Sequence, residues 1–144
     1  ATHGINYQAE NFAIRVRELT GNRGANLIID VSGAEYFKQN LTSAAIDGRI
    51  VILALMGGRN VDQVDLSPIL LNRIKIVGST LRNRNLDYRT KLTAEFTRNC
   101  LPLFKIGQLQ PIIDRVQPWE EVAEAHRYME SNQNIGKIIL ELPD

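Results

Sequence analysis

The sequence predicts an α/β fold in which helices flank a parallel β-sheet. Segments with strand and helix patterns alternate along most of the chain. The apolar runs Asn26–Gly33 and Arg49–Leu55 are typical of parallel strands that are covered on both faces. The pattern G-x-G-x-x-G, which marks a dinucleotide-binding turn, does not occur in the 144 residues. We therefore expect part of a doubly wound sheet, beginning after such a turn.

The first third of the chain predicts a strand, a helix and a second strand. Gly4–Tyr7 is expected to form a short strand. The next segment, Glu10–Leu19, places Phe12, Val16 and Leu19 at the i, i+4 and i+7 spacing of one helix face. Asn26–Gly33 follows as a central strand.

The middle third continues the same alternation. A helix over Glu35–Ile46 and the strand Arg49–Leu55 form a right-handed crossover with the strand before them. Ser67 is expected to cap a short helix with Pro68 at its first position. This helix leads to the strand Lys75–Thr80.

The last third does not continue the doubly wound pattern. A long helix is predicted over Tyr88–Ile106, and Gly107 suits the position just after its end. A strand, a helix and a strand follow, over Leu109–Val116, Trp119–Glu130 and Lys137–Leu142.

Composition excludes several classes of partner. Seventeen Lys and Arg residues balance sixteen Asp and Glu residues without charge runs, so we expect no nucleic-acid partner. The longest apolar run, Ile50–Met56, is too short to cross a bilayer, so we expect no membrane association. A single cysteine and two distant histidines predict no disulfide and no metal site. These features favour a reducing, cytoplasmic compartment.

Several short motifs carry a family resemblance through their order and spacing. They are Asn6-Tyr7, Asp30-Val31-Ser32-Gly33, Asp47-Gly48-Arg49, Gly78-Ser79, Glu124-Ala125-His126-Arg127-Tyr128-Met129-Glu130 and Gly136-Lys137-Ile138-Ile139-Leu140. Together they resemble the medium-chain dehydrogenase/reductase superfamily. The turn Leu55-Met56-Gly57-Gly58 is similar to that of its zinc-free quinone oxidoreductases, especially the stress-inducible NADPH:quinone reductases.

The resemblance implies a domain organisation. Residues 1–107 would be the C-terminal part of a nucleotide-binding, Rossmann-type domain, with helices on both faces of a sheet that lacks its first two strands. Residues 108–144 would be the C-terminal strand-helix-strand segment of the catalytic domain. Family members pair the strand equivalent to Ile74–Thr80 across a two-fold axis, so the resemblance also implies a homodimer through the sheet edge.

The resemblance further implies a cofactor, NADP, lying across the carboxyl ends of the strands. Tyr7 would lie near its adenosine side, and the Ser32-Gly33 turn would face it. Asn132 or Asn134 would return toward the phosphates. The residues implied at the nicotinamide end are Ala54, Leu55, Met56, Gly57, Ser79, Thr80 and Leu81.

The implied activity is hydride transfer from the nicotinamide to a small quinone or enone. This chemistry requires positioning more than reactive side chains, so no catalytic residue is assigned. Without a phosphate-binding loop the chain is expected to be inactive alone. The alternative is a stand-alone, dimerising interaction or structural module without catalysis.

Two side chains have competing interpretations. Asp30, at a strand end, could take part in acid-base chemistry, but a turn-capping role is favoured. His126 shares a helix face with Val122 and Met129, which favours a packed, hydrogen-bonded histidine over a metal ligand.

Overall fold

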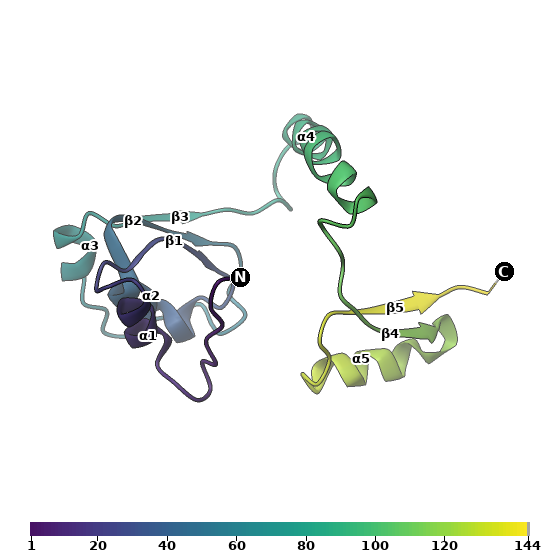
Figure 1. The fold of residues 1–144 in the computed structure, drawn as a ribbon, viewed down its shortest axis with the longest axis horizontal. Helices are drawn as coiled ribbons and strands as arrows, with labels where there is room; N and C mark the ends of the chain where they lie inside the picture. The colour runs from purple at the N-terminus through teal and green to yellow at the C-terminus, as the bar shows by residue number, and fades with distance from the viewer. Residues whose placement is uncertain (144) are drawn as a thin grey trace. The chain divides into compact units, whose positions relative to one another are not determined.

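A computed structural model describes residues 1–143 and contains two compact units, Ala1–Arg84 and the residues from Asn85 onward (Figure 1). The boundary between the two units thus lies just before a long helix. The boundary predicted at residue 107 instead separates segments that would belong to two different domains of the parent protein. The two compact units do not test that boundary, which stays a prediction. No helix among the described residues is long and apolar enough to cross a membrane.

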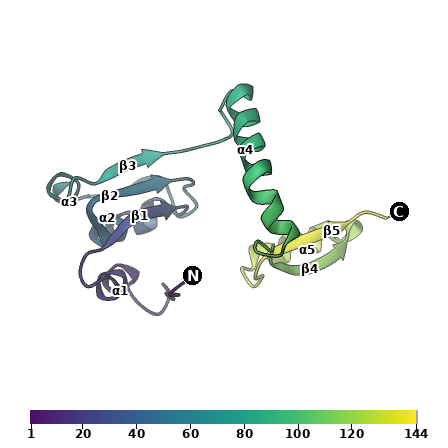
Figure 2. The same cartoon turned by 45° about the horizontal axis from the view of Figure 1, so that its top comes forward.

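The first unit is organised around a three-stranded parallel sheet (Figure 2). Its strands lie in the order β1 (Ala25–Asp30), β2 (Ala44–Ile52) and β3 (Lys75–Gly78). Ile28 of β1 is paired with Ile50 of β2, which is paired with Ile76 of β3. This parallel register brings the carboxyl ends of the strands to one edge of the sheet, and the predicted α/β fold is confirmed.

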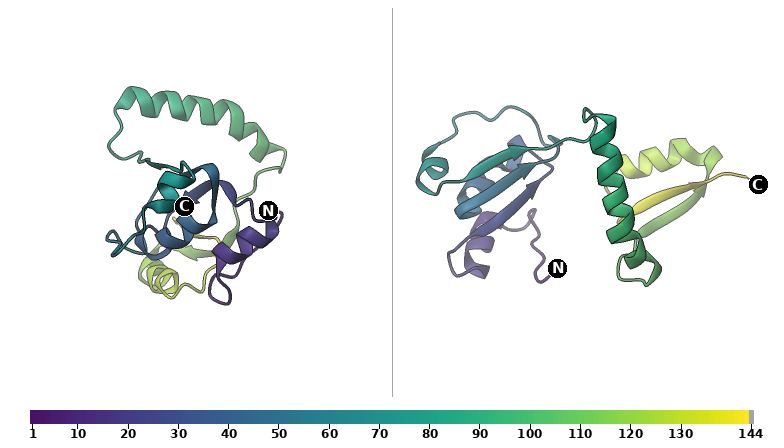
Figure 3. Two further views of the ribbon diagram at one scale, coloured as in Figure 1. Left: turned by 90° about the vertical axis from the view of Figure 1, so that its left-hand side faces the viewer. Right: turned by 90° about the horizontal axis from the view of Figure 1, so that it is seen from above.

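Helices cover the sheet face on which Ile50 is fully buried. They are α1 (Phe12–Leu19), α2 (Phe37–Ser43) and α3 (Ser67–Leu71), and Figure 3 shows them beside the strands. Leu41, Ala44, Ile50 and Ile74 form the core, against which Ile28, Phe37 and Ile69 pack. Side chains that alternate to the opposite face stay exposed, including Leu27 and Ile29, each at 56%.

Arg17 joins α1 to the end of α2. Its guanidinium donates hydrogen bonds to the carbonyl oxygens of Thr42, at 2.8 and 3.0 Å, and of Ala44, at 3.0 Å. A further bond, of 2.7 Å, reaches the carbonyl of Asn22. The last carbonyls of a helix have no partner within the helix, so Arg17 satisfies acceptors where the chain turns from α2 into β2.

The second unit contains α4 (Leu86–Lys105), β4 (Ile113–Pro118), α5 (Val122–Glu130) and β5 (Lys137–Glu141). β4 and β5 are parallel, as the strand-helix-strand pattern predicted. Gly107 ends α4 with a φ of 72°, and the amides of Gly107 and Gln108 donate to the carbonyls of Phe104 and Leu103 at 3.1 and 2.9 Å. This is the C-terminal cap predicted for Gly107.

The structure corrects several predicted elements. The helix expected to run to Ile46 ends at Ser43, and Ala44–Ile46 belong to β2 instead. Gly4–Tyr7 is not a strand, because no described strand pairs with it; the chain turns instead at Asn6, whose carbonyl accepts from Ala9 and Glu10. Ser67 begins α3 rather than capping it, and Asp65 Oδ1 accepts from the Ser67 amide at 2.8 Å. The strand expected from Leu109 begins only at Ile113.

The Arg17 contacts predict a stability effect. We expect Arg17→Ala to lower the free energy of unfolding by about 2 kcal/mol, since hydrogen bonds from a charged group typically contribute about 1.5–3 kcal/mol. Urea unfolding followed by circular dichroism measures the change. Arg15→Ala is the control, because Arg15 forms an exposed pair with Glu18 at 2.8 Å, and its loss should cost under about 0.5 kcal/mol. Equal losses in the two variants would contradict the role of Arg17.

Candidate functional site

The turns that follow β1 and β2 are hydrogen-bonded to each other at the carboxyl edge of the sheet. The amides of Leu53 and Gly57 donate to the carbonyls of Asp30 and Ser32, both at 2.7 Å. The amide of Met56 donates to Val31 at 3.2 Å, and the amide of Ala34 donates to Gly58 at 3.0 Å. Two segments predicted separately, 32–33 and 54–57, therefore form one structure, here called the paired turns.

Two glycines permit this close approach. Gly33 has a φ of 80°, and a Cβ there would lie 2.8 Å from the carbonyl oxygen of Gly58. A Cβ on Gly57 would lie 2.5 Å from Ser32 Oγ. Side chains at these positions would push the turns apart, since real Cβ atoms do not come so close to other atoms.

Asp30 fixes the conformation of the first turn. Its Oδ1 accepts hydrogen bonds from the amides of Ser32, at 2.8 Å, and Gly33, at 3.0 Å, which confirms the turn-capping interpretation. The residue is only 5% exposed, and its second oxygen, Oδ2, has no hydrogen-bond partner among the described residues. A buried acceptor without a donor is costly, so this atom suits a donor brought by a ligand.

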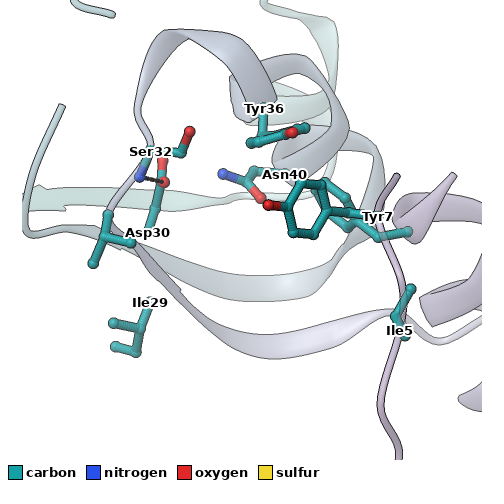
Figure 4. Close-up of a pocket in the computed structure, with 9 residues that line it drawn as sticks. Ile5, Tyr7, Ile29, Asp30, Ser32, Tyr36 and Asn40 are labelled. Carbon is teal, nitrogen blue, oxygen red and sulfur yellow. Dashed lines mark hydrogen bonds between the residues drawn. The ribbon is translucent and has the colours of Figure 1, made fainter. Parts of the chain in front are cut away.

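A pocket of about 280 Å³ opens beside this turn (Figure 4). Tyr7 and Ser32, both predicted site residues, line it. The remaining lining residues are Ile5, Phe12, Ile29, Asp30, Val31, Tyr36 and Asn40. The rings of Tyr7 and Tyr36 meet edge to face, with centroids 5.7 Å apart. The pocket thus combines apolar and aromatic walls with a few polar groups, as small-molecule sites do.

Tyr36 and Asn40 were not predicted as site residues. Burial, and then the neighbouring Glu35 carboxylate, raise the pKa of Tyr36, so its phenol keeps its proton at neutral pH. Asn40 is 4% exposed, and its side chain has no hydrogen bond among the described residues. The sequence held one signal for Asn40, because it lies three residues after Phe37 on the apolar face of the predicted helix.

The other predicted residues lie as follows. Met56 is 84% exposed, and its amide, like that of Gly57, is used within the paired turns. We find no partner among the described residues for the amides of Ala54 and Leu55, which leaves them open to a ligand. The Ser79 amide donates to Ile52 at 3.0 Å at the end of β3, and the exposed Thr80 and Leu81 follow it.

Asn132 and His126 belong to the second unit. Asn132 lies in the turn after α5, with a φ of 55°, and its amide donates to Met129 at 3.2 Å. Its expected role near the cofactor phosphates stays a prediction. His126 is exposed rather than packed, because α5 turns Ala125 instead toward the buried side.

A sequence model described as Zinc-binding dehydrogenase matches residues 1–140. The chain belongs to this family. Quinone oxidoreductase-like protein 2 of Bos taurus is 28% identical over 145 residues, covering 99% of the chain and 40% of that protein. The 2-haloacrylate reductase of a Burkholderia species is also 28% identical, covering 96% of the chain and 41% of its own length. The resemblance to quinone oxidoreductases is confirmed.

A solved structure shares the fold of this chain. It is a putative alcohol dehydrogenase from Sinorhizobium meliloti 1021, with a TM-score of 0.74 and 31% identity, covering 98% of the chain and 38% of that structure. The chain thus spans about two fifths of the length of the relatives it matches. The described residues contain no group of three or more His, Cys, Asp or Glu residues that could hold a metal. That the enzyme needs no zinc stays a prediction.

Dehydrogenases and reductases of this family depend on NAD or NADP. The residues at the carboxyl edge of the sheet offer contacts that suit part of such a cofactor. The free Asp30 Oδ2 and the open amides of Ala54 and Leu55 offer an acceptor and two donors, and Gly33 and Gly57 keep side chains out of the paired turns.

The paired turns predict a test of the glycines. We expect Gly33→Ala to lower the free energy of unfolding by about 2 kcal/mol, because a positive φ strains an alanine by about 1–3 kcal/mol and its Cβ meets Gly58. Hydrogen exchange should show faster exchange at the Met56 and Gly57 amides. Gly78→Ala is the control, because a Cβ there meets nothing within 4 Å. Unchanged exchange at both amides in Gly33→Ala would show that the turns do not depend on this glycine.

Proposed function

We propose that the chain supplies the cofactor-binding half of an NADPH-dependent reductase that acts on a small quinone or enone. The observation that carries the proposal is the pocket at the carboxyl edge of the sheet, where the buried Asp30 Oδ2 lacks a donor. Open α/β sheets bind ligands at this edge. Family membership supports an oxidoreductase, and the printed names of two relatives, a quinone oxidoreductase-like protein and a 2-haloacrylate reductase, support the substrate class.

The chain's own residues would bind and orient the cofactor. A bound reduced nicotinamide supplies the hydride in such enzymes. The amides of Ala54 and Leu55 would donate to its carboxamide, with Ser79, Thr80 and Leu81 flanking the same end. Tyr7 and the Ser32-Gly33 turn would contact the adenosine end. The hydrogen bonds of the paired turns hold these groups before binding, and such preorganisation lowers the entropic cost of positioning.

The preference for NADPH over NADH rests on Tyr7 and on the family resemblance. Tyr7 lines the pocket, and its phenol would donate to the added phosphate of NADPH. We place the protein in the cytoplasm, given its single cysteine, Cys100. The chain alone would be inactive, since no glycine-rich phosphate-binding turn occurs in its sequence.

Titration with NADPH tests this function. We expect weak, saturable binding by the 144-residue chain, seen by nicotinamide fluorescence and calorimetry, and tighter binding of NADPH than of NADH. Quinone reduction should not exceed the rate without protein. Tyr7→Ala should weaken NADPH binding about tenfold, since a lost hydrogen bond to a charged group costs about 1.5–3 kcal/mol.

Tyr88→Ala is the matched control, because it removes the same side chain from α4 in the second unit. It should leave the affinity for NADPH unchanged. Absence of NADPH binding to the unaltered chain would contradict the proposed function. An equal loss of NADPH affinity in both variants would contradict the role of Tyr7.

A second candidate function is a dimerising interaction module without catalysis. β1 and β3 form the two edges of the three-stranded sheet, and Val77 on β3 is 45% exposed. An unpaired edge strand is a template for pairing with another chain. This property is compatible with either function, since the parent reductase would form a homodimer through the same edge.

Sedimentation equilibrium tests the assembly. We expect a dimer that Val77→Lys weakens about tenfold or more, because a lysine on an edge strand opposes pairing. Val116→Lys on β4 is the control, since Val116 is exposed to a similar extent, 54%. A monomer at high protein concentration would contradict pairing through the edge.

A further inference from the structure

The second unit has a free sheet edge with an apolar cavity beside it. β4 and β5 form a two-stranded parallel sheet, and α5 lies along one face of it (Figure 1). The cavity, of about 100 Å³, lies between α5 and β5. Its lining residues are Ala125, His126, Met129, Ile138 and Leu140, none of which belongs to β4. The cavity therefore lies on the side of the helix next to the outer edge of β5.

The backbone of β5 directs half of its hydrogen-bonding groups away from β4. The amide of Lys137 donates to the carbonyl of Ile112, just before β4, at 2.8 Å. Successive residues of a strand direct their amide and carbonyl groups to opposite sides. Ile139 therefore also faces β4, whereas Ile138 and Leu140 direct their groups to the free edge. An unpaired edge of this kind is a template for another strand.

The opposite edge of the same sheet is less suited to pairing. The pairing of β4 shifts register between Ile113 and Arg115, and β4 ends in Pro118, which has no amide hydrogen. Bulges and prolines are features that protect edge strands from further pairing. The sequence of β5, Lys-Ile-Ile-Leu-Glu, contains no proline and pairs without an extra residue. The edge of β5 is therefore the one open to a partner strand.

We propose that β5 pairs with β5 of a second copy of this chain, antiparallel and about a two-fold axis at Ile139. In this register the strand is complementary to itself. Lys137 of each copy lies opposite Glu141 of the other, and Ile138 lies opposite Leu140. Among the described residues, neither Lys137 nor Glu141 has an ion-pair partner within its own chain. The charge complementarity thus identifies a second copy as the partner.

The backbone of β5 permits this register. Ile138 and Leu140 point their amide and carbonyl groups outward, so they face each other across the axis and exchange hydrogen bonds. Lys137 and Glu141 fall at a non-hydrogen-bonded position, where opposite side chains are closest. A shift by one residue would set outward groups against inward ones. A shift by two residues would set a charged end of the strand against Ile139.

The same pairing brings the two α5 helices together. Directly opposite residues of paired strands share a face, so both helices lie on one face of the resulting four-stranded sheet. Each helix covers its own pair of strands, and the helices therefore lie two strand spacings apart, about 9.6 Å. This separation falls within the about 8–10 Å at which helices pack. His126 and Met129 are exposed in the single chain, Met129 at 48%, and would line the contact between the helices.

Sedimentation equilibrium of charge variants tests the proposal. Each sample is the 144-residue chain with Val77→Lys, which weakens pairing through β3. We expect this chain still to form dimers at high protein concentration. Lys137→Glu and Glu141→Lys should each weaken these dimers about tenfold, because each change sets like charges opposite each other twice. Lys91→Glu on α4 is the matched control, since it makes the same change of net charge at an exposed position and should leave the dimer unchanged.

A mixture of the two charge variants tests the register. Lys137→Glu and Glu141→Lys chains, mixed in equal amounts, should associate about as tightly as the chain with neither change, because every glutamate then lies opposite a lysine. No recovery in the mixture would overturn the proposal, and so would an equal loss in the Lys91→Glu control. A Val77→Lys chain that stays monomeric at high concentration would also overturn it and leave a different strand as the occupant of this edge.

Hydrogen exchange locates the contact. The amides of Ile138 and Leu140 should exchange more slowly as the protein concentration rises, whereas the amide of Ile139, which faces β4, should change least. Unchanged exchange at Ile138 and Leu140 in a dimeric sample would overturn the proposal. The contact involves only the second unit, so its outcome is independent of NADPH binding at the first.

Discussion

The buried carboxylate of Asp30 is the contact on which the carboxyl edge of the sheet depends. Its Oδ1 holds the amides of Ser32 and Gly33, and its backbone carbonyl accepts from Leu53 at 2.7 Å. Hydrogen bonds to a charged acceptor are stronger than neutral ones, and burial removes competing water. The same residue therefore shapes the turn after β1 and fixes the start of the turn after β2, and the two glycines let the turns meet.

The path of the chain then brings distant residues to this edge. Parallel pairing aligns the ends of β1, β2 and β3, so Asp30, Leu53 and Ser79 arrive at one edge although 49 positions separate the first from the last in the sequence numbering. α2 starts soon after the first turn and packs through Leu41 against Ile50, which places Asn40 beside the pocket. Arg17 holds the far end of the same helix.

Sequence patterns were informative where local chemistry decides the structure. The apolar runs predicted β1 and β2, and the short polar side chain of Asp30 at a strand end predicted its turn. Prediction was weaker where contacts with residues distant in the sequence decide the structure. Gly4–Tyr7 has a strand-like pattern but no described strand beside it. The helix pattern put Asn40 on an apolar face, but only the packing of α2 against the sheet places it beside the pocket. The role of Asn132 also depends on remote neighbours, so no local pattern could fix it.

The unpaired oxygen of Asp30 connects stability with binding. A buried acceptor without a donor costs about 1–3 kcal/mol, a large part of the margin of a small domain. Asp30 cannot simply be replaced by an apolar residue, because its other oxygen holds the turn. A ligand that brings a donor to Oδ2 would therefore recover this cost on binding.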